Sequence, residues 1–211
     1  HAEIRSLPHL DQPDIQAYFN PVRADAQPWF PGIRPVQEHR VSAVVCLLQP
    51  ESRGHLRLAS DDPFAKPRIQ LNLMESRKDV DALIRSVKLI RELYETAPLS
   101  DLVSREISPG AGVDSDADIE AFLRRTLATS HHAVGSCTMG HGPLAVVDPQ
   151  LRVHGMEGLR VIDASVMPTV PGGNTNAPSI MIGEKGADLL RGRRLPSAEV
   201  KIKAVSRTLP N

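Results

Sequence analysis

Apolar and polar positions alternate along the part of the chain that begins near residue 40. The segment VSAVVCLLQP (41–50) is β-branched and apolar, and GHLRLAS (54–60) and RIQLNL (68–73) alternate with a period of two. Such a period is typical of β-strands, so these three closely spaced segments predict an antiparallel sheet. Residues 1–39 are interrupted by prolines and predict strands joined by extended loops.

Two segments with helical periodicity follow. The first covers residues 78–96 and is stopped by Pro98. The second begins at Ser115, where Asp118 three residues later is typical of a capping box. Each helix carries an apolar stripe that we expect to lie in the core: Val80, Leu83, Ile84, Val87 and Ile90 in the first, and Ile119, Phe122, Leu123 and Leu127 in the second.

The character of the sequence changes after Thr129. Glycine, histidine and proline are crowded into SHHAVGSCTMGHGP, residues 130–143. Residues 159–163 then predict a short buried strand, and residues 174–190 predict a loop that leads into a helix. Three small residues in this helix permit close packing against a neighbour: Gly183, Gly186 and Ala187.

Composition argues against several classes of protein. Among 211 residues, 25 Lys and Arg balance 25 Asp and Glu, so we expect no nucleic-acid partner. No apolar segment reaches the roughly 18 residues of a membrane span, so we expect no transmembrane segment. Two cysteines, Cys46 and Cys137, are too few for a disulfide framework and favour a reducing compartment, the cytoplasm.

The histidine-rich segment suggests two chemistries for which the spacing is poor. A Ser-His-Asp hydrolase could use Ser136 or Ser165 with His132 and Asp163, but no G-x-S-x-G motif exposes a nucleophile. A metal-dependent hydrolase is the second alternative, although no zinc-ligand motif is present. Its ligands would come from five residues: His131, His132, Cys137, His141 and His154.

A more informative pattern begins at the predicted strand 159–163. Asp163, Ala164 and Ser165 would follow at its carboxyl end, where α/β sheets bind ligands. The segment PGGNTNAP (171–178) then opens a helix whose first N–H groups could stabilise negative charge on a bound ring or phosphate. The same residues fit a helix capped by Asn174 or Asn176 with no ligand, so the pattern alone leaves both interpretations open.

The C-terminal half also contains two long stretches, HHAVGSCTMG (131–140) and VVDPQLRVHGMEGLRVIDASVMPTVPGGNTNAPSIMIGEKGADLL (146–190). Together they resemble the C-terminal signature of the glucose–methanol–choline (GMC) oxidoreductases, choline-dehydrogenase-like branch. The earlier QPESRGHLRLASDDPFAKPRIQLNLM (49–74) is similar to the family's substrate-domain sheet. The resemblance therefore covers most of the chain. It implies an FAD-dependent oxidoreductase that oxidises a small-molecule alcohol to an aldehyde by hydride transfer to the flavin.

The resemblance also implies roles for particular residues. His132 matches the family's catalytic histidine, and Asn174 matches the second active-site position, which is histidine or asparagine in the family. An imidazole can accept the proton that the hydroxyl must lose, and a carboxamide can bind the same oxygen without competing for that proton. Four further positions match contacts to FAD: Asp163 and Ala164 near its ribityl-pyrophosphate part, and Asn176 and Ala177 at the pyrimidine end of the flavin.

One element of the family pattern, the G-x-G-x-x-G fingerprint for dinucleotide binding, does not occur in the sequence. We therefore expect a C-terminal fragment that needs a missing N-terminal FAD-binding portion and is inactive alone. The alternative is a stand-alone binding module without flavin. The expected fold is α+β, with three parts: an antiparallel substrate-domain sheet with covering helices (1–128), an active-site and FAD-domain strand-helix segment (129–191), and a tail (192–211).

Overall fold

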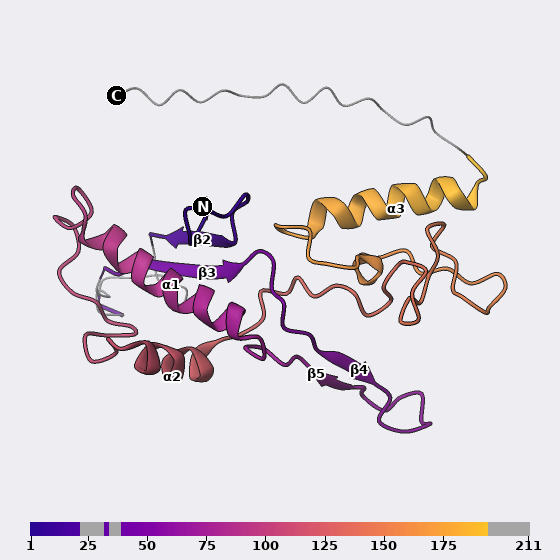
Figure 1. The fold of residues 1–211 in the computed structure, drawn as a ribbon, viewed down its shortest axis with the longest axis horizontal. Helices are drawn as coiled ribbons and strands as arrows, with labels where there is room; N and C mark the ends of the chain where they lie inside the picture. The colour runs from indigo at the N-terminus through magenta and orange to yellow at the C-terminus, as the bar shows by residue number, and fades with distance from the viewer. Residues whose placement is uncertain (22–31, 34–38, 194–211) are drawn as a thin grey trace.

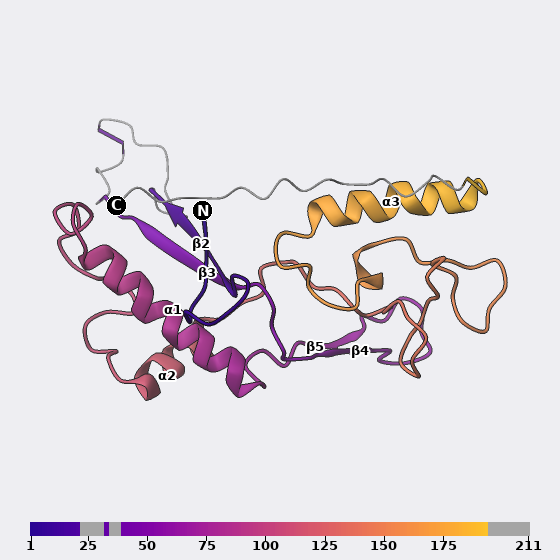
Figure 2. The same ribbon diagram turned by 45° about the horizontal axis from the view of Figure 1, so that its top comes forward.

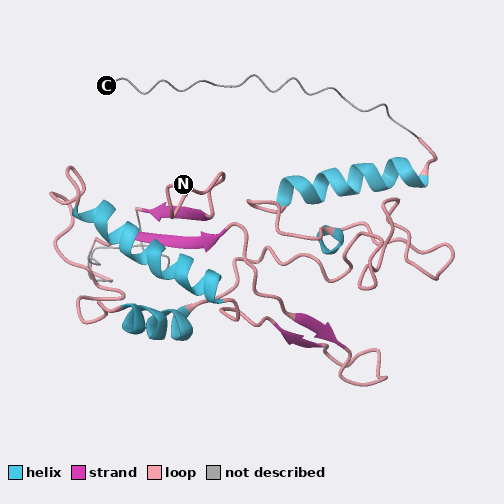
Figure 3. Cartoon of the chain, in the orientation of Figure 1, coloured by secondary structure: helices cyan, strands magenta, loops and turns pink. Residues whose placement is uncertain are grey.

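The computed structural model describes residues 1–21, 32–33 and 39–193. Short antiparallel sheets and separate helices give the described part an α+β fold, as predicted (Figures 1 and 3). The elements follow in this order: β1 (Ala2–Ile4), β2 (Ile15–Asn20), β3 (Ser42–Leu47), β4 (His55–Arg57), β5 (Arg68–Gln70), α1 (Arg77–Glu95), α2 (Asp116–Thr126), the 3₁₀ helix η1 (Ala164–Val166) and α3 (Asn176–Leu190).

The strands form two sheets rather than one. Strands β1, β2 and β3 pair in that order, and β4 pairs only with β5 in a ribbon that extends away from the first sheet (Figure 1). The antiparallel pairing expected after residue 40 is present, but the prediction that all three segments share a sheet is wrong. All residues of β4 and β5 are exposed, so the ribbon has no buried face to hold it on β3.

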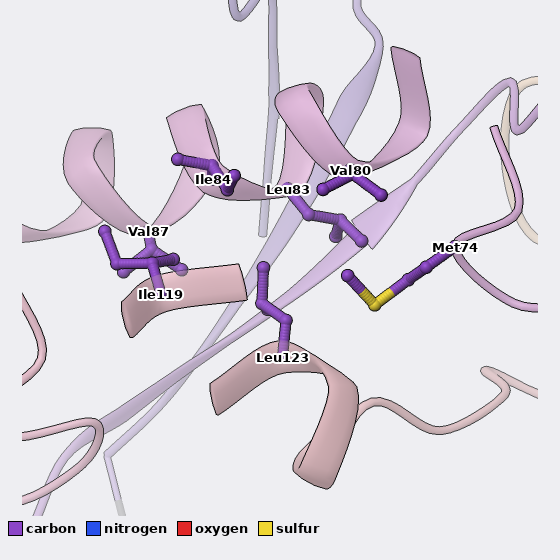
Figure 4. Close-up of a cluster of buried hydrophobic side chains, with 7 residues drawn as sticks. All are labelled: Met74, Val80, Leu83, Ile84, Val87, Ile119 and Leu123. Carbon is purple, nitrogen blue, oxygen red and sulfur yellow. The ribbon is translucent and has the colours of Figure 1, made fainter. Parts of the chain in front are cut away.

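The first core lies where α1 and α2 pack together and α1 contacts β3 (Figures 1 and 2). The helix predicted over 78–96 is α1, and the predicted capping box at Ser115 and Asp118 begins α2. Buried Asp79 accepts backbone N–H bonds from Glu51 and Ser52, which ties the start of α1 to the segment after β3. The close-up in Figure 4 shows the buried side chains: Met74, Val80, Leu83, Ile84, Val87, Ile119 and Leu123.

The second core lies in the C-terminal part, where α3 covers a segment made mostly of loops (Figure 3). Its buried members are Val147, Leu151, Val166, Met167 and Ile182. Gly186 permits the predicted close packing, because a Cβ there would lie 2.3 Å from Ile162 Cγ2. Gly183 does not have this role, since nothing lies within 4 Å of the position of its Cβ.

The strand predicted over 159–163 is wrong. A strand needs a run of paired residues, and in the described part of the chain this segment pairs through a single isolated bridge between Arg160 and Arg152. Two backbone bonds flank it, from the Val153 N–H to the Leu159 carbonyl and from the Val161 N–H to the Leu151 carbonyl. Asp163 consequently caps the 3₁₀ helix η1, which starts at Ala164, instead of ending a strand.

Three further expectations concern the whole chain. None of the described helices is long and apolar enough to cross a membrane. Cys46 and Cys137 are both free thiols. The domain boundaries at 128/129 and 191/192 stay predictions, and most of the predicted tail, from residue 194, lies outside the described residues.

Candidate active site

One face of the β2–β3 pair carries the floor of the site. Strand alternation places Gln16 and Tyr18 of β2 on the same face, and the antiparallel register sets them directly opposite Cys46 and Val44 of β3. Gln16 is buried, with only 4% of its surface exposed, which is unusual for an amide side chain. A buried amide normally has hydrogen-bond partners, and Gln16 finds them in the site.

The structure brings the two predicted catalytic residues together. His132 lies in the loop after α2, and Asn174 lies two residues before α3, yet Asn174 Nδ2 is 2.9 Å from His132 Nε2. Gln16 Nε2 donates to Asn174 Oδ1 at 3.4 Å. The Tyr18 hydroxyl lies 3.0 Å from the same oxygen and 2.7 Å from Gln16 Oε1. Segments more than 150 residues apart in sequence therefore share one hydrogen-bonded group.

The other nitrogen of the imidazole contacts the residue that begins α3. His132 Nδ1 is 2.9 Å from the hydroxyl oxygen of Thr175, which is buried and occupies the N-cap position. The Thr175 side chain makes no capping hydrogen bond to the helix. An N-cap hydroxyl usually satisfies one of the first helical N–H groups, and here it serves the histidine instead.

Four of these polar residues, Gln16, Tyr18, His132 and Asn174, line a cavity of about 320 Å³. The cavity also has an apolar wall, formed by Val44, Leu47, Leu48 and Val170. Burial raises the pKa of the Cys46 thiol, which also lines the cavity, so the thiol stays uncharged at neutral pH. The result is a pocket lined by both hydrogen-bonding and apolar side chains, as is usual for sites that bind small organic molecules.

The other four predicted site residues do not line this cavity. Asp163 caps η1 by accepting hydrogen bonds from the backbone N–H and the hydroxyl of Ser165, and Ala164 is the first residue of η1. Asn176 and Ala177 begin α3 and are exposed. Their assignment to FAD binding stays a prediction.

Three alternative interpretations of the sequence are wrong. No group of three or more His, Cys, Asp or Glu side chains among the described residues could hold a metal ion. A Ser-His-Asp triad is not formed, because the two ring nitrogens of His132 contact Thr175 and Asn174, while the Ser165 hydroxyl bonds Asp163. Asn174 and Asn176 do not cap α3, since the N-cap is Thr175.

Sequence analysis missed three residues of the hydrogen-bonded group: Gln16, Tyr18 and Thr175. A signal for the first two was present, because Gln16 and Tyr18 alternate with the apolar Ile15 and Ala17 in a β-strand pattern. Their pairing with β3 and their contact with Asn174 depend on long-range structure.

One protein-family model matches a large part of the chain. The model of the C-terminal part of the GMC oxidoreductases matches residues 50–183, which include His132 and Asn174. The chain belongs to the GMC oxidoreductase family. The resemblance to this family that the sequence indicated is confirmed.

Curated relatives are choline dehydrogenases. The chain is 43% identical over 198 residues to an oxygen-dependent choline dehydrogenase of Chromohalobacter salexigens, covering 93% of this chain and 35% of the relative. It is also 43% identical to the corresponding enzyme of Klebsiella pneumoniae, with 90% of this chain and 34% of the relative covered. The chain therefore spans about a third of the length of the relatives it matches.

Solved structures of similar fold include oxidases. Pyridoxine 4-oxidase from Mesorbium loti superposes with a TM-score of 0.77 at 27% identity, covering 92% of this chain and 38% of the oxidase. A variant formate oxidase of Aspergillus oryzae RIB40, studied for its FAD modification, superposes with a TM-score of 0.74 at 33% identity, covering 87% and 32%.

Proposed function

We propose that this chain carries the proton-accepting and substrate-orienting residues of an FAD-dependent oxidoreductase that oxidises an alcohol to an aldehyde. The observation that carries the proposal is the contact of His132 Nε2 with Asn174 Nδ2 at 2.9 Å, in a cavity that apolar side chains also line. Membership of the GMC oxidoreductases, together with choline dehydrogenases and oxidases among the similar proteins, supports the same class of reaction.

His132 is suited to accept the hydroxyl proton of the alcohol. The carboxamide nitrogen of Asn174 can only donate, so its contact at 2.9 Å fits an Nε2 atom that accepts. An alcohol oxygen placed between these two groups would give its proton to Nε2 and accept a hydrogen bond from the amide. General-base help of this kind accelerates reactions by roughly 10²–10⁴-fold.

The start of α3 has features that fit the flavin end of FAD. The Thr175 hydroxyl contacts His132 and makes no capping bond, so its side chain leaves the first N–H groups of the helix, at Asn176 and Ala177, uncapped. No atom lies within 4 Å of where a Cβ would stand at Gly172 or Gly173, so a planar ring could approach this backbone closely. When bound, the flavin would supply the hydride acceptor. Asn176 and Ala177 would hold it through their N–H groups, and Asp163 and Ala164 would lie toward its ribityl-pyrophosphate part.

The chain spans about a third of its relatives' length, so we propose that residues outside this chain complete the FAD site. The substrate is a small-molecule alcohol, and its apolar part would lie against Val44, Leu48 and Val170. Flavin absorbance that co-purifies with the full-length protein would support this proposal. Colourless protein with tight binding to another macromolecule would instead support a binding module. The cytoplasmic location stays a prediction.

The test is the His132→Asn variant of the full-length, flavin-loaded protein, with alcohol oxidation followed through a dye acceptor. We expect kcat/KM to fall at least about a hundredfold, because the proton acceptor is lost. His131→Asn is the matched control, since His131 is the exposed neighbour and asparagine tolerates its positive φ of 62°. Equal effects of the two variants, or near-parental turnover of His132→Asn, would remove His132 from the proposed role.

A further inference from the structure

The polar side chains at the site form a continuous chain of hydrogen bonds. It joins Tyr18 to Gln16, Gln16 to Asn174, Asn174 to His132 and His132 to Thr175. Tyr18 and Gln16 donate the first two bonds, and the direction of the two bonds of the imidazole depends on the orientation of Asn174. The direction of these bonds matters for two reasons. A carboxamide can rotate so that its oxygen and nitrogen exchange places, and an imidazole can carry its proton on either nitrogen.

The end near β2 fixes the orientation of Asn174. The Gln16 amide donates to the Asn174 oxygen there at 3.4 Å, which orients that oxygen toward β2. The Tyr18 hydroxyl has a single hydrogen, which it can give either to Gln16 Oε1 at 2.7 Å or to Asn174 Oδ1 at 3.0 Å, so Gln16 is the donor to Asn174 that does not depend on Tyr18. Gln16 is 4% exposed, so water does not readily replace either bond.

The end near α3 fixes the imidazole. With the Asn174 oxygen held toward Gln16, its NH₂ group points at His132 Nε2, and that nitrogen must be the unprotonated one. The ring proton then resides on Nδ1, where the Thr175 hydroxyl oxygen accepts it at 2.9 Å. Thr175 is 8% exposed, and although it occupies the N-cap position, its side chain makes no capping bond to α3. Its hydroxyl is therefore available to His132.

We propose that Gln16 and Thr175 are positioning residues that select the Nδ1-protonated tautomer of His132, and thereby present the Nε2 lone pair to the alcohol. The inference rests on the proposed function only for its effect on rate. The tautomer itself is a property of this chain and can be measured without substrate.

The main test is Gln16→Glu, studied at alkaline pH, where the introduced carboxyl group is ionised. A carboxylate only accepts hydrogen bonds, so Asn174 would turn its NH₂ toward it and its oxygen toward His132. His132 would then carry its proton on Nε2. Nitrogen-15 NMR of histidine-labelled full-length protein, with His132 assigned by loss of its signals in His132→Asn, reports which nitrogen is protonated.

We expect Nδ1 protonation in the parent, Nε2 protonation in Gln16→Glu, and a loss of kcat/KM of about a hundredfold, the lower range of general-base contributions. Gln12→Glu, an exposed position on the chain, is the control for added charge and should leave both quantities unchanged. Nε2 protonation in the parent, or an unchanged tautomer in Gln16→Glu, would overturn the proposal.

A second pair of variants changes Thr175, at the α3 end of the hydrogen-bonded chain. It tests the same proposal if Gln16→Glu fails to fold. Thr175→Val removes the acceptor of the Nδ1 proton at nearly constant shape, and Thr175→Ser keeps it. We expect mixed tautomers and slower turnover in the first, and parental behaviour in the second. Equal tautomers in both would contradict the role of Thr175. Reversal of the tautomer without any alcohol oxidation in the parent would refute the proposed function but keep the positioning role.

Discussion

Helix α3 offers a sharp test of its packing, because two of its glycines differ only in what surrounds them. Changing Gly186 to alanine would place a Cβ 2.3 Å from Ile162 Cγ2 and 2.9 Å from Ile162 Cδ1. Changing Gly183 to alanine would place a Cβ in open space, with no atom within 4 Å. Both substitutions occur inside the same helix, so the gain in helix propensity is common to both.

The size of the difference follows from two terms. Alanine in place of glycine stabilises a helix interior by about 0.5–1 kcal/mol. The overlap at Gly186 is more than 1 Å inside an ordinary carbon contact of about 3.5–4.0 Å, and overpacking of a core costs typically 1–3 kcal/mol. Ile162 cannot easily yield, because Cγ2 is attached to its branched Cβ. We therefore expect Gly183→Ala to stabilise by about 1 kcal/mol and Gly186→Ala to destabilise by about 1–2 kcal/mol.

The assay is equilibrium urea unfolding followed by far-ultraviolet circular dichroism. In an Ile162→Ala background the obstructing atoms are gone, so adding Gly186→Ala should become neutral or stabilising, a coupling of at least about 1 kcal/mol between the two sites. Equal shifts of Gly183→Ala and Gly186→Ala, or an unchanged penalty in the Ile162→Ala background, would refute the close packing of α3 on Ile162.

Three further predictions concern the first core and its surface. Ser115→Ala removes the capping box of α2 and should lower the free energy of unfolding by about 1 kcal/mol, measured by urea unfolding. Asp79→Ala leaves two backbone N–H groups without their acceptor and should cost about 1–3 kcal/mol, while Asp79→Asn, which keeps one acceptor oxygen, should cost less in the same assay. Hydrogen bonds from Arg124 and then Arg77 hold the pKa of the Glu120 carboxyl below its ordinary value, so its contribution is present above the unfolded-state pKa and is lost as pH falls through the folded-state pKa. Glu120→Gln should flatten the acid limb of a stability–pH profile, and an unchanged limb would contradict this.

Local patterns were sufficient for the helices. Helix α1 ends at Glu95, three residues before Pro98, and α2 begins after the Ser115 cap, because these signals act within a few residues. Pairing of strands depends on partners that are distant in sequence, so the separate β4–β5 ribbon and the absence of a strand at 159–163 could not be derived from alternation alone.

The candidate site divides in the same way. His132 and Asn174 were found through a long family signature, and the structure places them in contact. Gln16 was missed, although its strand pattern is visible, because only the register with β3 and the return of the chain before α3 show that its amide faces Asn174. A residue that, like Gln16, contacts another side chain of the site is not marked by a short sequence motif.

The separation of 156 residues between Tyr18 and Asn174 has a consequence for folding. Closing a flexible loop of that length costs on the order of 4 kcal/mol in chain entropy, and the closure becomes favourable only when the intervening cores have already formed. We therefore expect the Tyr18 hydroxyl to contact Asn174 late during refolding, after both hydrophobic cores have formed. The cavity beside His132 and Asn174 would then be among the first parts of the native molecule to open under denaturing stress.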